Sequence, residues 1–294
     1  MTLIPEEFNT KTQAKGWLQS IGKKIWLPLV IILIMLFCLA PVMWQLLTSF
    51  KENQDISAVP SVYLPGRITL SHYLDLFTRR PFWHYILNSA FVSIISTVLS
   101  LAIGAPAAYA LARLRPLGGN IILALVLIVT LFPGILLFLG LLEIIQGLRL
   151  GNNYLALIIP YTAINLPLTI LVLRSFFQQL PKDLEDSAKM DGYNTVQMLV
   201  QILLPLTLPA LVTTGILTFI FAWNEFIFAL TFITREDMKT IPVAAAQLGS
   251  TSAFEIPYGP IAAATVVGTV PLVLLVLLFQ QKIVQGLTAG AVKG

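Results

Sequence analysis

Acidic side chains are the groups in this sequence best suited to chemistry, and they occur in two settings. Four of them lie in residues 181 to 209, a polar stretch between two apolar blocks: Asp183, Glu185, Asp186 and Asp191. A fifth, Glu225, is the only acid inside an apolar block. Because a carboxylate is costly in lipid, we expect Glu225 to face other helices or a cavity and to have a partner. A structural hydrogen bond, a position near the outer membrane surface, substrate contact and proton or sodium coupling all remain open for it.

The sequence lacks the patterns of several other kinds of chemistry. No Gly-x-x-x-x-Gly-Lys-[Ser/Thr] loop is present, so the chain does not hydrolyse ATP itself, and no nucleophile is paired with a base. A single cysteine, Cys38, excludes an internal disulfide, and His72 and His84 lack partners at metal-ligand spacing. No basic patch interleaved with aromatic residues indicates nucleic-acid binding. We therefore expect neither enzymatic activity nor a cofactor or metal in this chain.

The composition is that of a membrane protein. Of 294 residues, 57% are hydrophobic and 11% are charged, against about 25% charged in ordinary globular proteins. Six apolar segments are long enough to cross a bilayer: 25 to 50, 85 to 112, 116 to 142, 150 to 173, 204 to 233 and 256 to 281. The fold class predicted is therefore an all-α membrane protein with six transmembrane helices in residues 25 to 281. Residues 1 to 24 and 282 to 294 flank this domain.

Two of these segments are expected to be broken along their length. The third is broken at Pro133-Gly134, and the fourth is interrupted by Pro160 and Pro167. Broken helices at membrane depth are tolerated where protein or a water-filled cavity takes up the freed backbone groups. The region is a candidate wall of a pathway, and five polar residues are candidates to line that pathway: Asn88, Tyr161, Asn165, Asn224 and Glu225.

Six helices put both termini on one side of the membrane, and the basic residues indicate which side. With the termini inside, the cytoplasmic segments hold eleven Lys and Arg in 58 residues, and the external segments hold seven in 62. Cytoplasmic segments carry the excess of Lys and Arg in membrane proteins. We therefore predict cytoplasmic termini and a cytoplasmic location for residues 181 to 209.

A short helix is predicted within that polar stretch, from Asp183 to Asp191. Asp183 is expected to cap its first turn, and Gly192 to end it in a left-handed conformation. Leu184, Ala188 and Met190 are expected near one side. A helix of this length is not stable alone, so it must dock on something. A surface helix lying on the membrane is the simpler alternative.

The residues of this stretch resemble the EAA loop of bacterial ABC importer permeases. The family pattern is Glu-Ala-Ala, then Gly, then Ile-x-Leu-Pro at fixed spacing. It is matched here, with Asp186 for the usual Glu and Ser187 for the first Ala, by these residues: Asp186, Ser187, Ala188, Gly192, Ile202, Leu204 and Pro205. The resemblance implies a cytoplasmic coupling helix between transmembrane helices 4 and 5, in a loop of residues 181 to 205. Asp183, Glu185 and Asp191 belong to the surface that would contact an ATPase.

The end of the chain carries a second resemblance, to the smaller permease subunit of maltose-type importers, which ends Gly-Leu-Thr-Ala-Gly-x-Val-Lys-Gly. This chain has the same order in its tail, which by resemblance would reach the ATPase interface through these residues: Gly286, Leu287, Thr288, Ala289, Gly290 and Lys293. The run from Ala108 to Arg113 also resembles the end of the second helix in sugar-type permeases.

These resemblances imply a function and a set of partners. The chain is similar to a permease subunit of an ATP-driven carbohydrate importer in the bacterial cytoplasmic (inner) membrane. The implied partners are a second permease, two ATPase subunits that hold ATP and magnesium, an external or periplasmic substrate-binding protein and a sugar. A disaccharide, an oligosaccharide or a sugar-derived osmolyte is the implied substrate. An ion-coupled secondary transporter that uses Glu225 is the alternative, and a non-transporting membrane scaffold is a third possibility.

Overall fold

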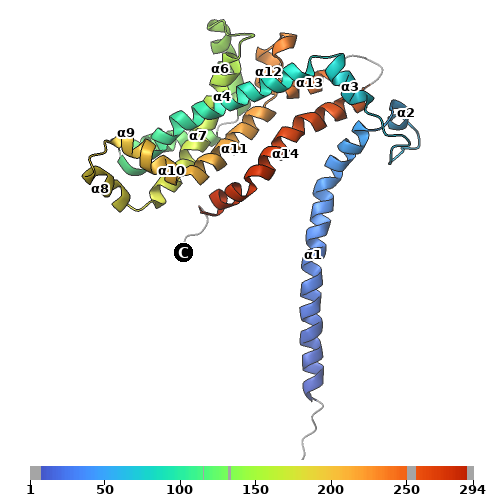
Figure 1. Cartoon of the computed structure of the whole chain (residues 1–294), viewed down its shortest axis with the longest axis horizontal. Coiled ribbons are helices and arrows are strands. Elements are labelled where there is room, and N and C mark those ends of the chain that lie inside the picture. The colour runs from blue at the N-terminus through green and yellow to red at the C-terminus, as the bar shows by residue number, and fades with distance from the viewer. Residues whose placement is uncertain (1–7, 115, 132–133, 250–255, 290–294) are drawn as a thin grey trace, which may run out of the picture.

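The computed structural model describes residues 8–114, 116–131, 134–249 and 256–289, with side chains for 26–114, 116–131, 136–249 and 256–283. Every regular element in these ranges is a helix. The five longest are α1 (Phe8–Ser49), α4 (Phe82–Tyr109), α7 (Leu155–Gln179), α11 (Leu208–Asn224) and α14 (Tyr258–Ala289). Helices α4, α7, α11 and α14 run alongside one another as a bundle, and α1 extends away from it (Figure 1).

Short helices gather at the two ends of this bundle (Figure 1). One end carries α8 (Asp183–Met190), α9 (Thr195–Met198), the π-helix η2 (Leu199–Leu203) and α10 (Leu204–Leu206). The other carries α2 (Asn53–Ile56), α3 (Ser71–Thr78), the 3-10 helix η3 (Glu236–Met238) and α13 (Ile241–Leu248). The remaining elements are the π-helix η1 (Ala110–Leu114), α5 (Gly119–Leu131), α6 (Gly134–Gly147) and α12 (Ile227–Phe232).

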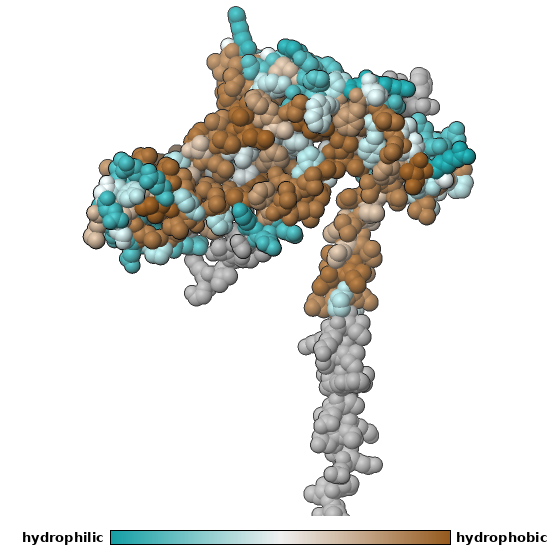
Figure 2. All heavy atoms as spheres, viewed as in Figure 1, coloured by the Kyte–Doolittle hydropathy of each residue, from teal (hydrophilic) through white to brown (hydrophobic). Residues whose placement is uncertain are grey.

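Apolar length identifies a multi-pass membrane protein. Within the described ranges, four helical stretches are long and apolar enough to cross a bilayer: Trp26–Ser49, Phe82–Leu114, Leu155–Gln179 and Tyr258–Ile283. Two further pairs of helices pass the same test but are bent by more than 40°, which gives up to six spans if each pair is one. Apolar residues cover most of the bundle and the coloured part of α1, and polar residues gather at the bundle ends (Figure 2).

The fourth apolar segment is not interrupted, which corrects the sequence prediction. Helix α7 continues through both Pro160 and Pro167. Prolines are tolerated in membrane helices where polar side chains and neighbouring helices stabilise the backbone. In α7, Thr162 and Thr169 donate to carbonyls one turn earlier, at 2.7 and 2.9 Å, and Ser100 of α4 donates to the Thr162 carbonyl at 3.3 Å.

The fifth apolar segment is not one helix. It consists of α10, α11 and α12, with breaks at Thr207 and at Glu225 and Phe226. The third segment is also two helices, α5 and α6, and the predicted break at Pro133 lies outside the described residues. The first and last apolar stretches, Trp26–Ser49 and Tyr258–Ile283, agree with the prediction to within two residues. The helices that contain them extend further, since α1 begins at Phe8 and α14 ends at Ala289.

Close packing of α4 against α7 forms the centre of the bundle. Small residues of α4 lie at this contact: Thr162 of α7 donates to the Ser96 carbonyl, Ser100 donates to the Thr162 carbonyl, and Gly104 lies against Thr169. Gly104 matters most, because a β-carbon placed there would lie 2.5 Å from the Thr169 γ-methyl group. Small residues of this kind allow two membrane helices to approach each other closely.

Replacing Gly104 with Ala therefore forces α4 and α7 apart. We expect Gly104→Ala to destabilise the folded protein by about 1 to 3 kcal/mol, the usual cost of overpacking. Thermal unfolding in detergent measures the effect. Gly140→Ala is the matched control, because that glycine also lies inside a helix and a β-carbon there meets nothing within 4 Å. Equal unfolding temperatures for the two variants would contradict the role given to Gly104.

Candidate functional site

The polar stretch forms α8 and a tight turn into α9 at one end of the bundle (Figure 1). The N-cap is Lys182, not Asp183 as predicted, and it makes no side-chain cap. Its carbonyl instead accepts from the amides of Glu185 and Asp186 at 2.9 and 3.1 Å. Asp183, Glu185 and Asp186 occupy the first turn, where negative charge stabilises the free amides of a helix.

Gly192 ends α8 as predicted, with φ of 81°. Two backbone bonds close the turn: the Tyr193 amide donates to the Ala188 carbonyl at 3.0 Å, and the Gly192 amide donates to Lys189 at 3.1 Å. This double closure requires a left-handed residue at position 192, which glycine adopts without strain. Asn194 then begins α9 by exchanging hydrogen bonds with Gln197. Residues 191 to 194 thus connect α8 to α9.

The faces of α8 differ from the prediction at one position. Ala188 and Glu185 are buried and Leu184 is half-buried, whereas the Met190 side chain is 86% exposed. Residues three and four apart share a helix face, and Met190 lies away from the face that contains Leu184 and Ala188. Five of the predicted coupling residues in α8 and its closing turn are exposed: Asp183, Asp186, Ser187, Asp191 and Gly192.

Glu185 points into the protein and pairs with Arg113. The Arg113 Nε and Glu185 Oε1 atoms lie 3.0 Å apart, and the two side chains are 9% and 12% exposed. The contact is an ion pair without hydrogen-bond geometry. Arg113 also donates to the Leu180 carbonyl at the end of α7. The pair therefore joins α8 to the ends of both α4 and α7.

Sequence reasoning missed this partner. Arg113 lies 72 positions before Glu185 in the chain, in the π-helix η1 that continues α4. A signal was present, because Arg113 directly follows the uncharged segment that ends at residue 112. A basic residue at the end of one span and an acidic one just beyond another are brought to the same end of a bundle. The buried cluster around them contains Tyr109, Phe177 and Ala188.

The later residues of the loop lead into α11. Ile202 and Leu204 are half-buried and Pro205 is exposed, while Leu203 between them is fully buried. The chain then bends by 81° between Thr195–Leu206 and Leu208–Asn224. The Thr207 hydroxyl stabilises the bend by donating to the Leu203 carbonyl at 3.0 Å.

The predicted tail residues are only partly described. Gly286, Leu287, Thr288 and Ala289 belong to the last turns of α14. Gly290 and Lys293 lie outside the described residues. The tail prediction therefore stays a prediction.

Glu225 lies at the break between α11 and α12 and has partners inside the bundle, as expected. Its carboxylate accepts from the amides of Phe228 and Ala229 at 2.9 and 3.2 Å, and from the Tyr161 hydroxyl of α7. These bonds cap the first turn of α12 and explain why the fifth apolar segment is not continuous. Glu225 also lines a mostly apolar cavity of about 430 Å³ between α5, α6, α7, α11 and α12.

The other candidate pathway residues make their hydrogen bonds within the chain. Asn88 is buried and donates to the Asp237 and Lys239 carbonyls at 2.8 and 3.0 Å, which fixes η3 against α4. Tyr161 and Asn165 are buried in the bundle. Asn224 donates to the Ile220 carbonyl at 2.9 Å, and its side chain is exposed.

Charged residues at the opposite end of the bundle form local pairs. Lys239 and then Tyr85, both donating to Glu236, lower the pKa of that carboxyl group. The Arg235 guanidinium lowers the pKa of Asp237 through a 2.6 Å contact. In the described part of the chain, no three His, Cys, Asp or Glu side chains are grouped to hold a metal ion. His72 bonds the Lys51 carbonyl at 2.9 Å.

Removing the charge of Glu185 should loosen α8. In Glu185→Gln the Arg113 charge stays buried without a counter-charge, which is strongly destabilising. We expect amide hydrogen exchange in residues 183 to 193 to accelerate 10- to 100-fold, that is by ~1.4 to 2.8 kcal/mol of local stability. Asp186→Asn is the control, because it makes the same chemical change at an exposed neighbour. Unchanged exchange in Glu185→Gln would show that the ion pair does not hold the helix.

The sequence is similar to a protein family and to individual known proteins. Residues 100–289 match the model of the binding-protein-dependent transport system inner membrane component. The sulfoquinovosyl glycerol transport system permease protein of Agrobacterium fabrum is 40% identical, over 87% of this chain and 89% of the relative. The trehalose/maltose transport system permease protein of Thermococcus litoralis is also 40% identical, over 94% of this chain and 99% of the relative.

A solved structure shares the fold. A chain from a bacterial ABC transporter involved in the import of the acidic polysaccharide alginate superposes with a TM-score of 0.72, at 22% identity, over 95% of this chain and 99% of that one. The match to the family model covers more than half of the sequence and includes α7, α8, the turn at Gly192 and α11. The chain belongs to the family of binding-protein-dependent transport system inner membrane components.

Proposed function

We propose that this chain is the membrane permease subunit of an ATP-driven ABC importer for a carbohydrate, and that it forms half of the translocation pathway. The observation that carries the proposal is near full-length similarity to permeases named for sugars and sugar glycosides. Besides the two relatives above, the trehalose transport system permease protein of Mycobacterium tuberculosis is 40% identical over 88% of this chain. The substrate class that follows is a disaccharide, an oligosaccharide or a sugar-derived osmolyte.

The proposed topology has six spans with both termini in the cytoplasm. Each bent pair of helices then contributes to one span, and residues 25 to 281 form the membrane domain. The distribution of Lys and Arg along the sequence supports this orientation. It places α8 in the cytoplasm, where a soluble ATPase can reach it.

Coupling is proposed to run through α8. Its exposed residues Asp183, Asp186, Ser187 and Asp191 would contact an ATPase subunit, and the Arg113–Glu185 pair would transmit movement of α8 to α4 and α7. ATP-driven closure of two ATPase subunits would then move α8 as a lever and rock the bundle between inward-open and outward-open states. ATP and magnesium belong to those partners in this proposal. The tail from Gly286 to Lys293 would extend the same interface.

Two further partners complete the proposal. A second permease would form the other half of the pathway, and the apolar span of α1, which is unburied within this chain, offers surface for it. An external substrate-binding protein would deliver the sugar. One structural neighbour is a bacterial alginate ABC transporter in complex with an alginate pentasaccharide-bound periplasmic protein, which supports this part of the assembly.

The pathway would include polar groups of this chain near the break at Glu225. Asn224 and Glu225 are the candidates with accessible side chains, and Asn88, Tyr161 and Asn165 would support the wall through the hydrogen bonds that they make. An ion-coupled transporter in which Glu225 carries the proton or sodium ion is the alternative.

The turn at Gly192 supplies a test of coupling. A β-branched residue at φ of 81° is strained by about 1 to 2 kcal/mol, so Gly192→Val should distort the end of α8. In proteoliposomes with the partner chains, we expect sugar transported per ATP hydrolysed to fall about tenfold. Gly192→Asn is the control, because asparagine tolerates this conformation. A normal ratio in correctly assembled Gly192→Val would contradict the lever.

The proposed function as a whole is tested by purifying the chain from its native membrane in mild detergent. We expect an ATPase, a second permease and a binding protein to co-purify, and one class of sugar to stimulate ATP hydrolysis. Recovery of the chain alone, with solute uptake that collapses when the proton gradient is removed while ATP persists, would instead establish the ion-coupled alternative.

A further inference from the structure

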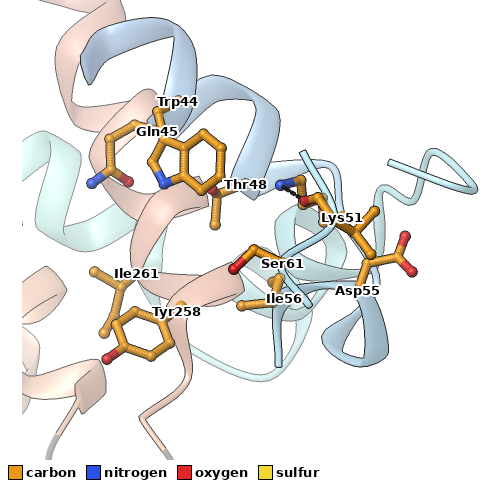
Figure 3. A pocket seen from close by; sticks show the side chains of 10 residues that line it. Trp44, Gln45, Thr48, Lys51, Asp55, Ile56, Ser61, Tyr258 and Ile261 are labelled. Atoms are coloured by element: carbon orange, nitrogen blue, oxygen red, sulfur yellow. Dashed lines mark hydrogen bonds between the residues drawn. The ribbon is translucent and has the colours of Figure 1, made fainter. Parts of the chain in front are cut away.

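A cavity of about 310 Å³ lies where the last turns of α1 meet the start of α14 (Figure 3). Its walls come from α1, α2, the loop that contains Ser61 and the first turns of α14. The side chains that matter for its chemistry are Trp44, Thr48, Lys51, Ser61 and Tyr258. Helix α2 and the ends of α1 and α14 that line it lie at the opposite end of the bundle from α8 (Figure 1).

Lys51 gives this cavity a positive charge without a counter-charge. The residue is 2% exposed, its Nζ atom donates to the Val62 carbonyl at 2.7 Å, and it lies 4.3 Å from the centre of the Trp44 ring. Neither partner is charged, and across the described ranges no carboxylate is within ion-pair distance of Lys51. A buried cation normally has an anionic partner.

The acid nearest in the lining does not fill this role. Asp55 accepts a hydrogen bond from the Gly66 amide at 2.9 Å. Figure 3 shows its carboxylate turned away from the side chains of Trp44 and Thr48. No carboxylate in the described ranges therefore neutralises the Lys51 ammonium group, and an anionic ligand in the cavity would do so.

Thr48 supplies an independent indication of a ligand. The residue is 8% exposed, and its hydroxyl group has no hydrogen-bond partner in the described part of the protein. Among the described residues, the hydroxyls of Ser93, Thr97, Tyr109 and Thr240 share this property, and of the five only Thr48 lines this cavity. Ser61 presents a second hydroxyl at the same cavity (Figure 3). The groups left for a ligand are thus two hydroxyls beside a cation, which favours a ligand rich in acceptor oxygens and negatively charged.

The position of the cavity indicates where such a ligand comes from. The apolar span Trp26–Ser49 ends beside it, so it lies at the boundary between lipid tails and water. Trp44 and Tyr258 are 45% and 55% exposed at its edge, and aromatic residues of this kind anchor at the level of lipid headgroups. Phosphodiesters are the anionic, acceptor-rich groups concentrated at that depth.

We propose that this cavity binds the phosphodiester of a lipid headgroup. Lys51 supplies the compensating charge, Thr48 and Ser61 donate hydrogen bonds to the phosphate oxygens, and Trp44 and Tyr258 flank the glycerol. A bound lipid would thereby join α1 to α14 at this end of the protein. The same chemistry would accept a soluble phosphate ester, and the experiment separates the two sources.

The test is native mass spectrometry of the complete transporter complex, partly delipidated and titrated with phosphatidylglycerol. We expect Thr48→Val, which keeps the size of the side chain, to weaken binding about tenfold through loss of one charge-assisted hydrogen bond. Thr78→Val is the matched control, since Thr78 is exposed on α3 and outside the cavity. Wild-type binding should also weaken as salt is raised.

Three outcomes would overturn the proposal. The first is equal phosphatidylglycerol affinity in wild type and Thr48→Val. The second is equally tight binding of a diglycosyl diacylglycerol, which has no phosphate, because the site would then not recognise an anion. The third is displacement of the lipid by glycerol 3-phosphate at equal concentration, which would assign the site to a soluble phosphate ester. Because every arm measures lipid retention, a failure here is independent of whether the complex transports sugar.

Discussion

Two opposite charges buried together, on Arg113 and Glu185, constrain how the polar end of this protein is built. Removing either from water is costly, so the two elements that carry them must stay in contact. The contact holds an eight-residue helix, too short to be stable alone, against the ends of α4 and α7. Apolar packing adds to this contact: Tyr109 packs on Phe177, with ring centres 5.7 Å apart, and Ala188 of α8 is buried in the same cluster. One face of α8 is thereby fixed and the other is left free for a partner.

A similar rule governs the polar residues along the bundle. Lipid offers no hydrogen bonds, so a polar group at that depth must find its partner within protein or in a cavity. Glu225 does so by capping α12 and accepting from Tyr161, and Asn88 does so by fixing the loop before α13. A polar residue in an apolar segment thus often has a role in the architecture.

The features that could be predicted from sequence depend on local properties. Apolar length predicted the four spans that single helices form, and the conformational freedom of glycine predicted the end of α8 at Gly192, because both properties belong to the residues themselves. The features that were missed depend on partners distant in the chain. Pro160 and Pro167 do not break α7, because α4 and polar side chains support it. Glu225, at the break between α11 and α12, accepts from the distant Tyr161 hydroxyl of α7. The cap at Lys182 and the exposure of Met190 depend on the docked orientation of α8, which sequence does not specify.

The π-helix η1 determines how the end of α4 responds to a change in the number of residues. A π-turn accommodates one residue more than an α-helix would over the same rise. Loss of a single residue between Ala110 and Leu114 would restore α-helical winding over the same rise, so the residues beyond η1 would keep nearly the same direction. The same loss inside α4, ahead of η1, would instead rotate Arg113 by about 100° and take it away from Glu185, although no residue type in the ion pair had changed. Single-residue deletions should therefore be commoner within η1 than within α4 among functional homologues, and alignments of relatives can reveal this difference.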